Sequence, residues 1–167
     1  GGVVNTDEHG EPNGIVSEAA VTWVRMNMPQ HSDEELVRWY KKAAGEMLRY
    51  GITSVQSDDL EIAGSVKRIL ELYGKMELAD EMPIRIAEQW SLSDEKQLRN
   101  FIDSGYHKHK ANSYFKSGPL KINVDGTLGA RTAALREEYS DDPGNRGVYA
   151  HSQEELDKLV TMAQSAE

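Results

Sequence analysis

The chain has 167 residues, with 19 Lys and Arg against 28 Asp and Glu, which gives a formal net charge of −9. This length suits one domain with a sizeable core, but a closed (β/α)₈ barrel needs roughly 200–250 residues. The acidic balance argues against non-specific nucleic-acid binding and against docking on anionic membranes. No apolar run approaches the roughly 18 residues of a membrane span. The absence of Cys excludes disulfides, a thiolate nucleophile and a Cys-ligated zinc site.

Residues 1–28 are expected to form an N-terminal extended and turn segment with a short helix. Two short extended pieces, at 3–6 and 15–16, flank a turn that contains Gly and Pro. Ser17 is placed to cap a helix that ends before Pro29. The start at Gly1-Gly2 without Met suggests a chain that begins within a longer one, or a removed tag. No N-terminal signal is visible, and a cytoplasmic location is the expectation.

Residues 29–167 show strands alternating with helices. Residues 32–35 form a capping box that opens a helix ending at Gly51, and residues 152–155 form a second one before the last helix. Two more helices are predicted over 62–73 and from Ser93 to Ile102. Short apolar runs predict strands at 52–55, 83–87 and 120–124, whereas residues 105–118 carry no assignable pattern. Residues 141–145 form a turn cluster.

This alternation favours βαβ units and a parallel sheet, and therefore an α/β fold. Ligand chemistry in such sheets collects at the carboxyl ends of the strands. In this chain those ends are residues 56–59, 88–90 and 125–131.

Lys121 interrupts an otherwise apolar strand candidate. Strand alternation would place Lys121, Asn123 and Asp125 on one face and Ile122 and Val124 on the other. If the polar face lines a barrel interior, Lys121 is functional, because an unpaired buried ammonium group is costly. An edge strand with a solvated face explains the pattern equally well.

Three other patterns have ordinary structural explanations. His107-Lys108-His109 has the spacing of a metal pair, but no apolar run precedes it, so a solvated loop is favoured. The loop from Gly126 to Arg131 offers N–H groups and a guanidinium to an anion, or it is a tight turn that needs Gly. Asp58-Asp59 offers an acid, a base or a metal ligand, or it is a capping pair.

A basic and aromatic patch could in principle bind nucleic acid. It is too short to favour that function on an acidic chain. Its residues are Lys108, Lys110, Lys116, Tyr106, Tyr114 and Phe115.

Residues 120–135, which read Leu-Lys-Ile-Asn-Val-Asp-Gly-Thr-Leu-Gly-Ala-Arg-Thr-Ala-Ala-Leu, resemble the signature stretch of the YtcJ-like branch of the amidohydrolase superfamily (amidohydrolase family 3). Residues 10–19, 51–55 and 83–86 resemble the segment before the second barrel strand, that strand and the third strand. Residues 139–143 and Gly147 also fit. The resemblance spans nearly the whole chain.

The resemblance implies a partial (β/α)₈ barrel, in which residues 29–167 supply about three parallel strands, the second to the fourth. It implies a metal-dependent hydrolase of non-peptide C–N bonds in amides, formamides or cyclic amides, with a small amide-type substrate. One or two divalent ions, with zinc expected, would activate water. Lys121 matches the position at which binuclear members carry a carbamate that bridges two ions.

The resemblance also implies that most of the active site lies outside this chain. None of the five His residues follows a buried strand, so none matches a family ligand. We therefore expect the isolated chain to hold no metal and to be inactive. Its open sheet has unpaired edges and an uncovered face, so it should also self-associate.

The site hypothesis combines the resemblance with the residues at the strand ends. Lys121 is the metal-bridging residue, and the substrate-side candidates are Asp125, Thr127, Arg131, Gln56, Asp58 and Gln89. The alternative is a non-catalytic α/β binding or assembly module that uses the loop from Gly126 to Arg131 for an anion or a partner. Neither hypothesis involves nucleic acid or a membrane.

Overall fold

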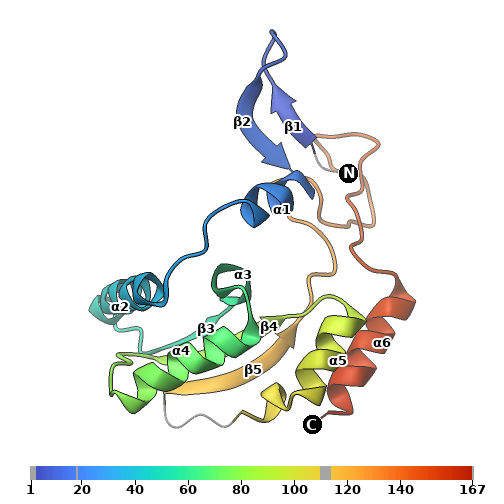
Figure 1. Cartoon of the computed structure of the whole chain (residues 1–167). Coiled ribbons are helices and arrows are strands. Elements are labelled where there is room, and N and C mark those ends of the chain that lie inside the picture. The colour runs from blue at the N-terminus through green and yellow to red at the C-terminus, as the bar shows by residue number, and fades with distance from the viewer. Residues whose placement is uncertain (1–2, 18, 110–113, 167) are drawn as a thin grey trace. The chain divides into compact units, whose positions relative to one another are not determined.

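The computed structural model describes residues 3–17, 19–109 and 114–166 (Figure 1). The chain divides into two compact units, Gly1–Ser32 and Asp33–Glu167. No helix in the described residues is long and apolar enough to cross a membrane.

The first unit is a β-hairpin followed by a helix. Strands β1 (Val3–Thr6) and β2 (Pro12–Ser17) pair antiparallel, and α1 (Ala19–Met26) follows. The Asp7 carboxylate closes the turn by accepting the backbone N–H groups of His9 and Glu11 at 2.9 and 3.0 Å. This part of the chain thus contains two extended pieces and a short helix, whereas the capping role given to Ser17 lies outside the described side chains.

The second unit alternates strands and helices. Its elements are α2 (Asp33–Arg49), β3 (Ser54–Ser57), α3 (Leu60–Ala63), α4 (Val66–Leu78), β4 (Arg85–Ser91), α5 (Glu95–Asp103), the short 3₁₀ helix η1 (Tyr106–Lys108), β5 (Phe115–Lys121) and α6 (Gln153–Gln164). The three strands form a parallel sheet in the order β3-β4-β5. The predicted α/β alternation around a three-stranded parallel sheet is confirmed.

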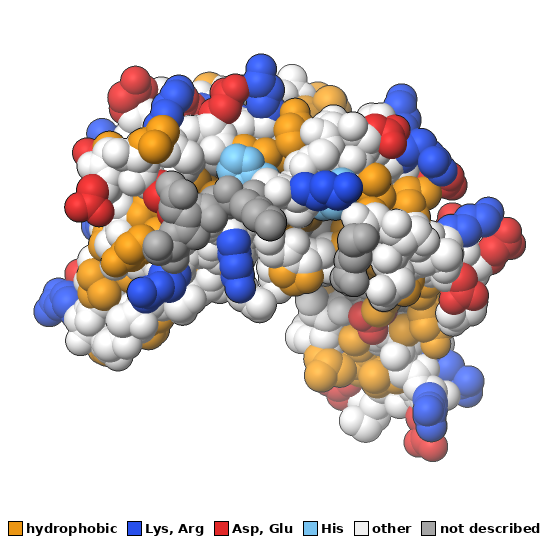
Figure 2. All heavy atoms as spheres, turned by 90° about the horizontal axis from the view of Figure 1, so that it is seen from below, with side chains coloured by type: hydrophobic (Ala, Val, Ile, Leu, Met, Phe, Trp, Pro, Cys, Tyr) orange, Lys and Arg blue, Asp and Glu red, His pale blue; other side chains and the backbone are white. Residues whose placement is uncertain are grey.

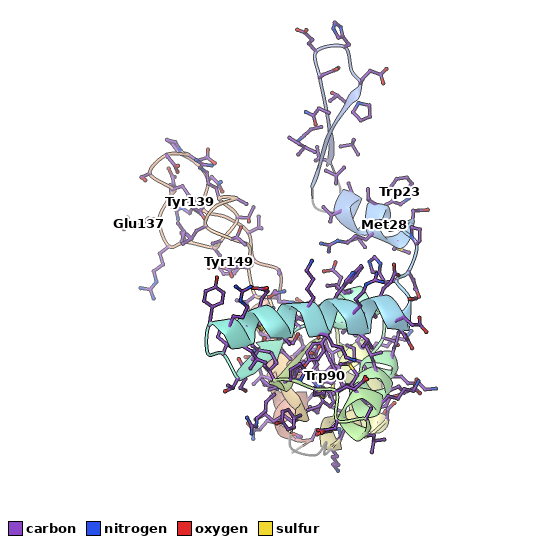
Figure 3. All side chains as sticks on the ribbon, turned by 90° about the vertical axis from the view of Figure 1, so that its left-hand side faces the viewer. Trp23, Met28, Trp90, Glu137, Tyr139 and Tyr149 are labelled. Atoms are coloured by element: carbon purple, nitrogen blue, oxygen red, sulfur yellow. The ribbon has the colours of Figure 1, made fainter. Side chains whose placement is uncertain are left out.

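Helices cover one face of this sheet. Ile86 and Trp90 of β4 and Phe115 of β5 belong to the same buried apolar cluster as residues of α2, α4, α5 and α6. Trp90, which is labelled in Figure 3, is 1% exposed. The centre of its ring lies 5.2 Å from that of Phe101. Side chains alternate along a strand, so the neighbours of these core residues point to the opposite face, which no helix of this cluster covers.

The predicted strands exist, but their boundaries are shifted. β3 begins and ends two residues later than predicted, so it includes Gln56. β4 ends later than predicted and continues through residues 88–90 to Ser91. The largest error concerns β5, which covers Phe115–Lys121 rather than residues 120–124. Residues 115–119 contain Gly118 and Pro119, which are poor strand formers, but pairing with β4 overrides this preference.

This shift corrects the alternation predicted around Lys121. Lys121 is the last residue of β5, and residues 122–124 have no regular structure, so Asn123 and Asp125 do not continue its face by strand alternation. The register between β4 and β5 also slips between Glu88 and Trp90. This irregularity brings Lys121 into register with Ser91.

Most helix boundaries follow the predicted signals. Gly51, with φ +78°, ends the α2 region and donates its N–H to the Leu48 carbonyl at 2.9 Å. The capping box before α6 is present, because the Ser152 hydroxyl accepts the Glu155 N–H and the Glu155 side chain accepts the Ser152 N–H. The single helix predicted over 62–73 is wrong: left-handed Gly64 ends α3, and Ser65 caps a separate α4. Asp94, not Ser93, caps α5.

Candidate functional site

Polar side chains gather on the sheet face that points away from the helical core. Gln89 and Ser91 alternate with the core residue Trp90 along β4, and Lys121 is the Cα partner of Ser91 on β5. Their positions near the carboxyl ends of parallel strands are where α/β sheets bind ligands. We call Gln56, Asp58, Gln89, Ser91 and Lys121 the polar cluster.

The centre of the polar cluster is the Asp58 carboxylate. Its Oδ2 atom accepts hydrogen bonds from Lys121 Nζ and from Ser91 Oγ, both at 2.7 Å. The side chains of Lys121 and Asp58 are 39% and 27% exposed, so the ion pair remains open to small molecules. The structure therefore brings together two predicted site residues, Lys121 and Asp58, from β5 and from the end of β3.

Two further predicted residues meet beside this pair. Gln89 Nε2 donates a hydrogen bond to Gln56 Oε1 at 3.2 Å across β3 and β4. Both amides keep unused donors and acceptors, which suit recognition of a substrate amide. Ser91 was not named from the sequence, because β4 was expected to end before it.

The structure does not join the other three predicted residues to Lys121. Arg131 donates to the Asp141 carboxylate at 2.7 Å, and Asp125 accepts the Ala134 N–H at 2.9 Å. Thr127 donates its N–H to the Thr132 hydroxyl at 3.0 Å. All three residues form bonds within residues 125–145, so their substrate-side role stays a prediction without support from contacts.

The same bonds weaken the alternative of an anion-binding loop. The N–H groups of Gly126, Thr127 and Arg131 are all donated within residues 126–132. The Arg131 guanidinium beside Asp141 is also engaged, and this pairing holds the pKa of Asp141 below its usual range. With three of its six N–H groups and its guanidinium engaged, the loop has fewer donors left for an anion.

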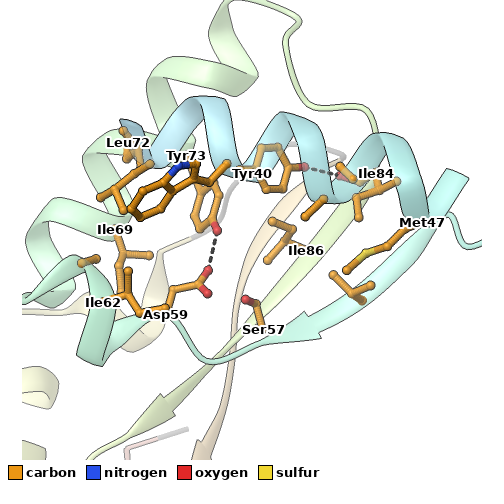
Figure 4. Close-up of a pocket in the computed structure, with 16 residues that line it drawn as sticks. Tyr40, Met47, Ser57, Asp59, Ile62, Ile69, Leu72, Tyr73, Ile84 and Ile86 are labelled. Atoms are coloured by element: carbon orange, nitrogen blue, oxygen red, sulfur yellow. Dashed lines mark hydrogen bonds between the residues drawn. The ribbon is translucent and has the colours of Figure 1, made fainter. Parts of the chain in front are cut away.

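Asp58 and Asp59 point to opposite sides of the sheet. Asp59 accepts a hydrogen bond from the Tyr73 hydroxyl under α2, beside an apolar cavity of about 330 Å³ (Figure 4). The Tyr40 hydroxyl donates to the Ile84 carbonyl at 3.1 Å in the same cavity, and burial raises the pKa of Tyr40 to about 12. Burial and the nearby Asp59 carboxylate also raise the pKa of Tyr73. Both phenols therefore stay neutral hydrogen-bond donors.

Sequence reasoning missed Glu88, which is 0% exposed and faces the helical core between Ile86 and Trp90. Its Oε1 atom accepts the Asp59 backbone N–H at 2.7 Å. Burial is the main cause that raises the pKa of Glu88 to about 8, and the Asp59 and Asp58 carboxylates add to it. Strand alternation could have revealed this burial. If the predicted strand is continued to Trp90, Glu88 lies on the same face as Ile86 and Trp90.

The remaining patterns do not form sites in the described residues. His107 and Lys108 belong to η1 and not to a strand. No group of three His, Cys, Asp or Glu side chains in the described parts of the chain could hold a metal ion. Phe115 of the basic and aromatic patch is 1% exposed, so it cannot stack on a base, and Lys110 lies outside the described residues. Acidic and basic side chains are interspersed over most of the face in Figure 2.

Solved structures identify the class of protein that has this fold. A crystal structure of an uncharacterized metal-dependent hydrolase from Pyrococcus horikoshii OT3 matches with a TM-score of 0.74 and 26% identity, over 98% of this chain and 32% of that one. A metal-dependent hydrolase from Pyrococcus furiosus, described as uncharacterized, matches with a TM-score of 0.68 and 20% identity, over 98% and 34% of the two chains. The second match bears on the fold alone.

The family follows from the sequence comparison. The model of the amidohydrolase family matches residues 1–167, and the chain belongs to that family. YtcJ of Bacillus subtilis (strain 168), which is named as an amidohydrolase, is 30% identical over 98% of this chain. Protein LONG AFTER FAR-RED 3 of Arabidopsis thaliana is 25% identical over a similar span. The chain spans 30% and 28% of the lengths of these two relatives.

Proposed function

We propose that this chain is the central part of a metal-dependent hydrolase that cleaves non-peptide C–N bonds in small amides, formamides or cyclic amides. The observation that carries the proposal is the polar cluster, in which Lys121 meets Asp58 and Ser91 at the carboxyl ends of three parallel strands. Membership in the amidohydrolase family supports the reaction class.

In this proposal the three strands are part of a (β/α)₈ barrel that the whole protein completes. β3 and β5 each have one strand neighbour among the described residues. The apolar cavity between α2, α4 and the β3 end of the sheet is also open. Additional strands and helices would satisfy the free strand edges and fill this cavity.

The described residues do not by themselves fit a metal ion, because no cluster of three ligating side chains exists among them. The proposal assigns this chain one contribution to the ion site, a carbamate formed on Lys121. The Lys121 ammonium would first lose one proton; the neutral amine would then form an N–C bond with CO₂ and lose a second proton, which leaves an anionic carbamate with oxygen donors. When bound, a divalent ion, with zinc expected, would lower the pKa of a bound water.

The remaining residues of the polar cluster hold Lys121 and the substrate. Before CO₂ is added, Asp58 and Ser91 hold the Lys121 ammonium group in place, although its long flexible stem otherwise has many rotamers. The Gln56 and Gln89 amides can pair with the N–H and C=O of a substrate amide. Asp125, Thr127 and Arg131 remain candidates for the substrate side.

The test is hydrolysis of a panel of N-formyl amines, acyl amides and cyclic amides by the whole purified protein. We expect turnover of at least one substrate class and its loss in Lys121→Ala. Lys116→Ala is the matched control, because Lys116 lies on the same strand and is exposed. Full activity of Lys121→Ala would refute the assigned role, and hydrolysis of esters alone would refute the substrate class.

A further inference from the structure

Glu88 is a buried acid that the proposed reaction does not use. Among the described residues it is the one charged or polar side chain in the buried class. It lies in the middle of β4, paired with Ser57 on one side and Ser117 on the other. Burying a carboxyl group in an apolar cluster is costly, so its retention there calls for a physical role.

Glu88 binds the junction between β3 and α3, which consists of Asp58 and Asp59. Its Oε1 atom accepts the Asp59 N–H at 2.7 Å, while its Oε2 atom is buried without a hydrogen-bond partner. The titratable groups on its side of the sheet are Asp59 from this junction and Tyr73 from α4, while the Asp58 carboxylate acts on it from the other side. No Lys or Arg forms an ion pair with Glu88 in the described residues. An ionised Glu88 would accept the Asp59 N–H more strongly, but its burial and its repulsion from the Asp59 and Asp58 carboxylates together outweigh this gain.

The junction also holds the centre of the polar cluster. Asp59 is fixed on the helical side through its N–H and through the Tyr73 hydroxyl. The preceding residue, Asp58, lies on the other side of the sheet and binds Lys121 and Ser91. Any shift of the Asp59 backbone therefore moves Asp58 relative to Lys121.

We propose that Glu88 is a positioning residue, whose carboxyl group fixes the β3–α3 junction so that Asp58 faces Lys121. Glu88 acts through the backbone of Asp59 and does not touch the reacting groups. The inference rests on the proposed function only in that Asp58 and Lys121 belong to the proposed site.

Hydrogen exchange of the whole protein, read by mass spectrometry on peptides that contain Asp59, tests this directly. Glu88→Gln keeps a neutral acceptor of the same shape, so it should protect the junction as the wild type does. Glu88→Ala leaves the Asp59 N–H without a partner, so exchange there should rise about tenfold while α6 stays unchanged. Glu95→Ala is the matched control, because Glu95 is an exposed acid paired with Arg99 on α5.

A pH series separates positioning from simple packing. The ratio of wild-type to Glu88→Gln exchange at the junction should stay near one at pH 6 and rise above pH 8, where Glu88 ionises. The Glu88→Gln reference removes the intrinsic pH dependence of exchange. This arm stands even if Glu88→Ala does not fold.

Three results would overturn the proposal: unchanged junction exchange in a folded Glu88→Ala, fast exchange in Glu88→Gln at pH 6, or a ratio that does not change with pH. None of these readouts depends on catalysis. A protein that hydrolyses no amide but shows the expected exchange pattern would therefore refute the proposed function and leave this inference intact.

Discussion

Replacing Gly118 by Ala tests how closely β5 packs on β4 beside the polar cluster. A Cβ atom at Gly118 would lie 3.1 Å from the Glu88 carbonyl carbon and closer still to its oxygen. Both are backbone atoms of the paired strand, so no side-chain rotation can relieve the clash. Overpacking in a core costs about 1–3 kcal/mol, and a clash with backbone belongs at the upper end, about 3 kcal/mol.

Gly74→Ala provides the matched control. Gly74 lies inside α4, and a Cβ atom there would meet nothing within 4 Å. Ala is favoured over Gly in a helix interior by up to about 1 kcal/mol, so this variant should be slightly stabilised. In urea and thermal unfolding, the free energy of unfolding should thus fall below that of the wild type for Gly118→Ala and rise slightly above it for Gly74→Ala. A Gly118→Ala protein as stable as the wild type would show that β5 does not lie this close to β4.

Four further predictions concern pH, capping, packing and assembly. Because the folded-state pKa of Glu88 is raised from 4.5 to about 8, its contribution to stability is complete below pH 4.5 and is lost as pH rises to about 8, at roughly 1.4 kcal/mol per unit. Glu88→Gln should flatten this slope in unfolding titrations, and an unchanged slope would exclude Glu88 as its source. Ser152→Ala removes the capping box of α6 and should cost about 0.5–2 kcal/mol by urea unfolding, whereas Ser152→Asp should retain most of the stability. Trp90→Phe removes the 2.7 Å hydrogen bond to the Ser117 hydroxyl and leaves a gap, with an expected loss of about 2 kcal/mol in unfolding experiments; no loss would place the indole outside the core. The isolated chain should be inactive and should self-associate through its open strand edges, and a cooperative monomer in sedimentation and melting would contradict this.

The sequence was most informative where a local signal sets the structure. The capping box at Ser152 and the glycine at Gly51 predict helix ends correctly, because both act through neighbouring backbone groups. The polar cluster was partly predictable for a similar reason. Residues at the carboxyl ends of parallel strands meet at one edge, which is why Asp58, Gln56 and Gln89 could be named before their contacts were known. Lys121 was named for other reasons, because it interrupts an apolar run and matches the family's signature stretch.

The position of β5 and the burial of Glu88 could not be predicted from the sequence, because both depend on contacts between distant segments. β5 contains Gly118 and Pro119, and only its register with β4 makes it a strand. Because β5 ends at Lys121, Asn123 and Asp125 do not follow the predicted alternation. Glu88 was missed because a carboxyl group normally marks the end of a buried run, and its burial depends on an N–H contributed by Asp59, 29 residues earlier.

We propose that Lys121 helps to hold a metal ion in the whole protein. The most direct test is the metal content of the purified whole protein, measured by elemental analysis for the wild type, Lys121→Ala and the same-strand control Lys116→Ala. We expect one or two divalent ions per chain in the wild type and in Lys116→Ala, and fewer in a folded Lys121→Ala. A wild type without metal, or a Lys121→Ala variant that keeps the full complement, would contradict it.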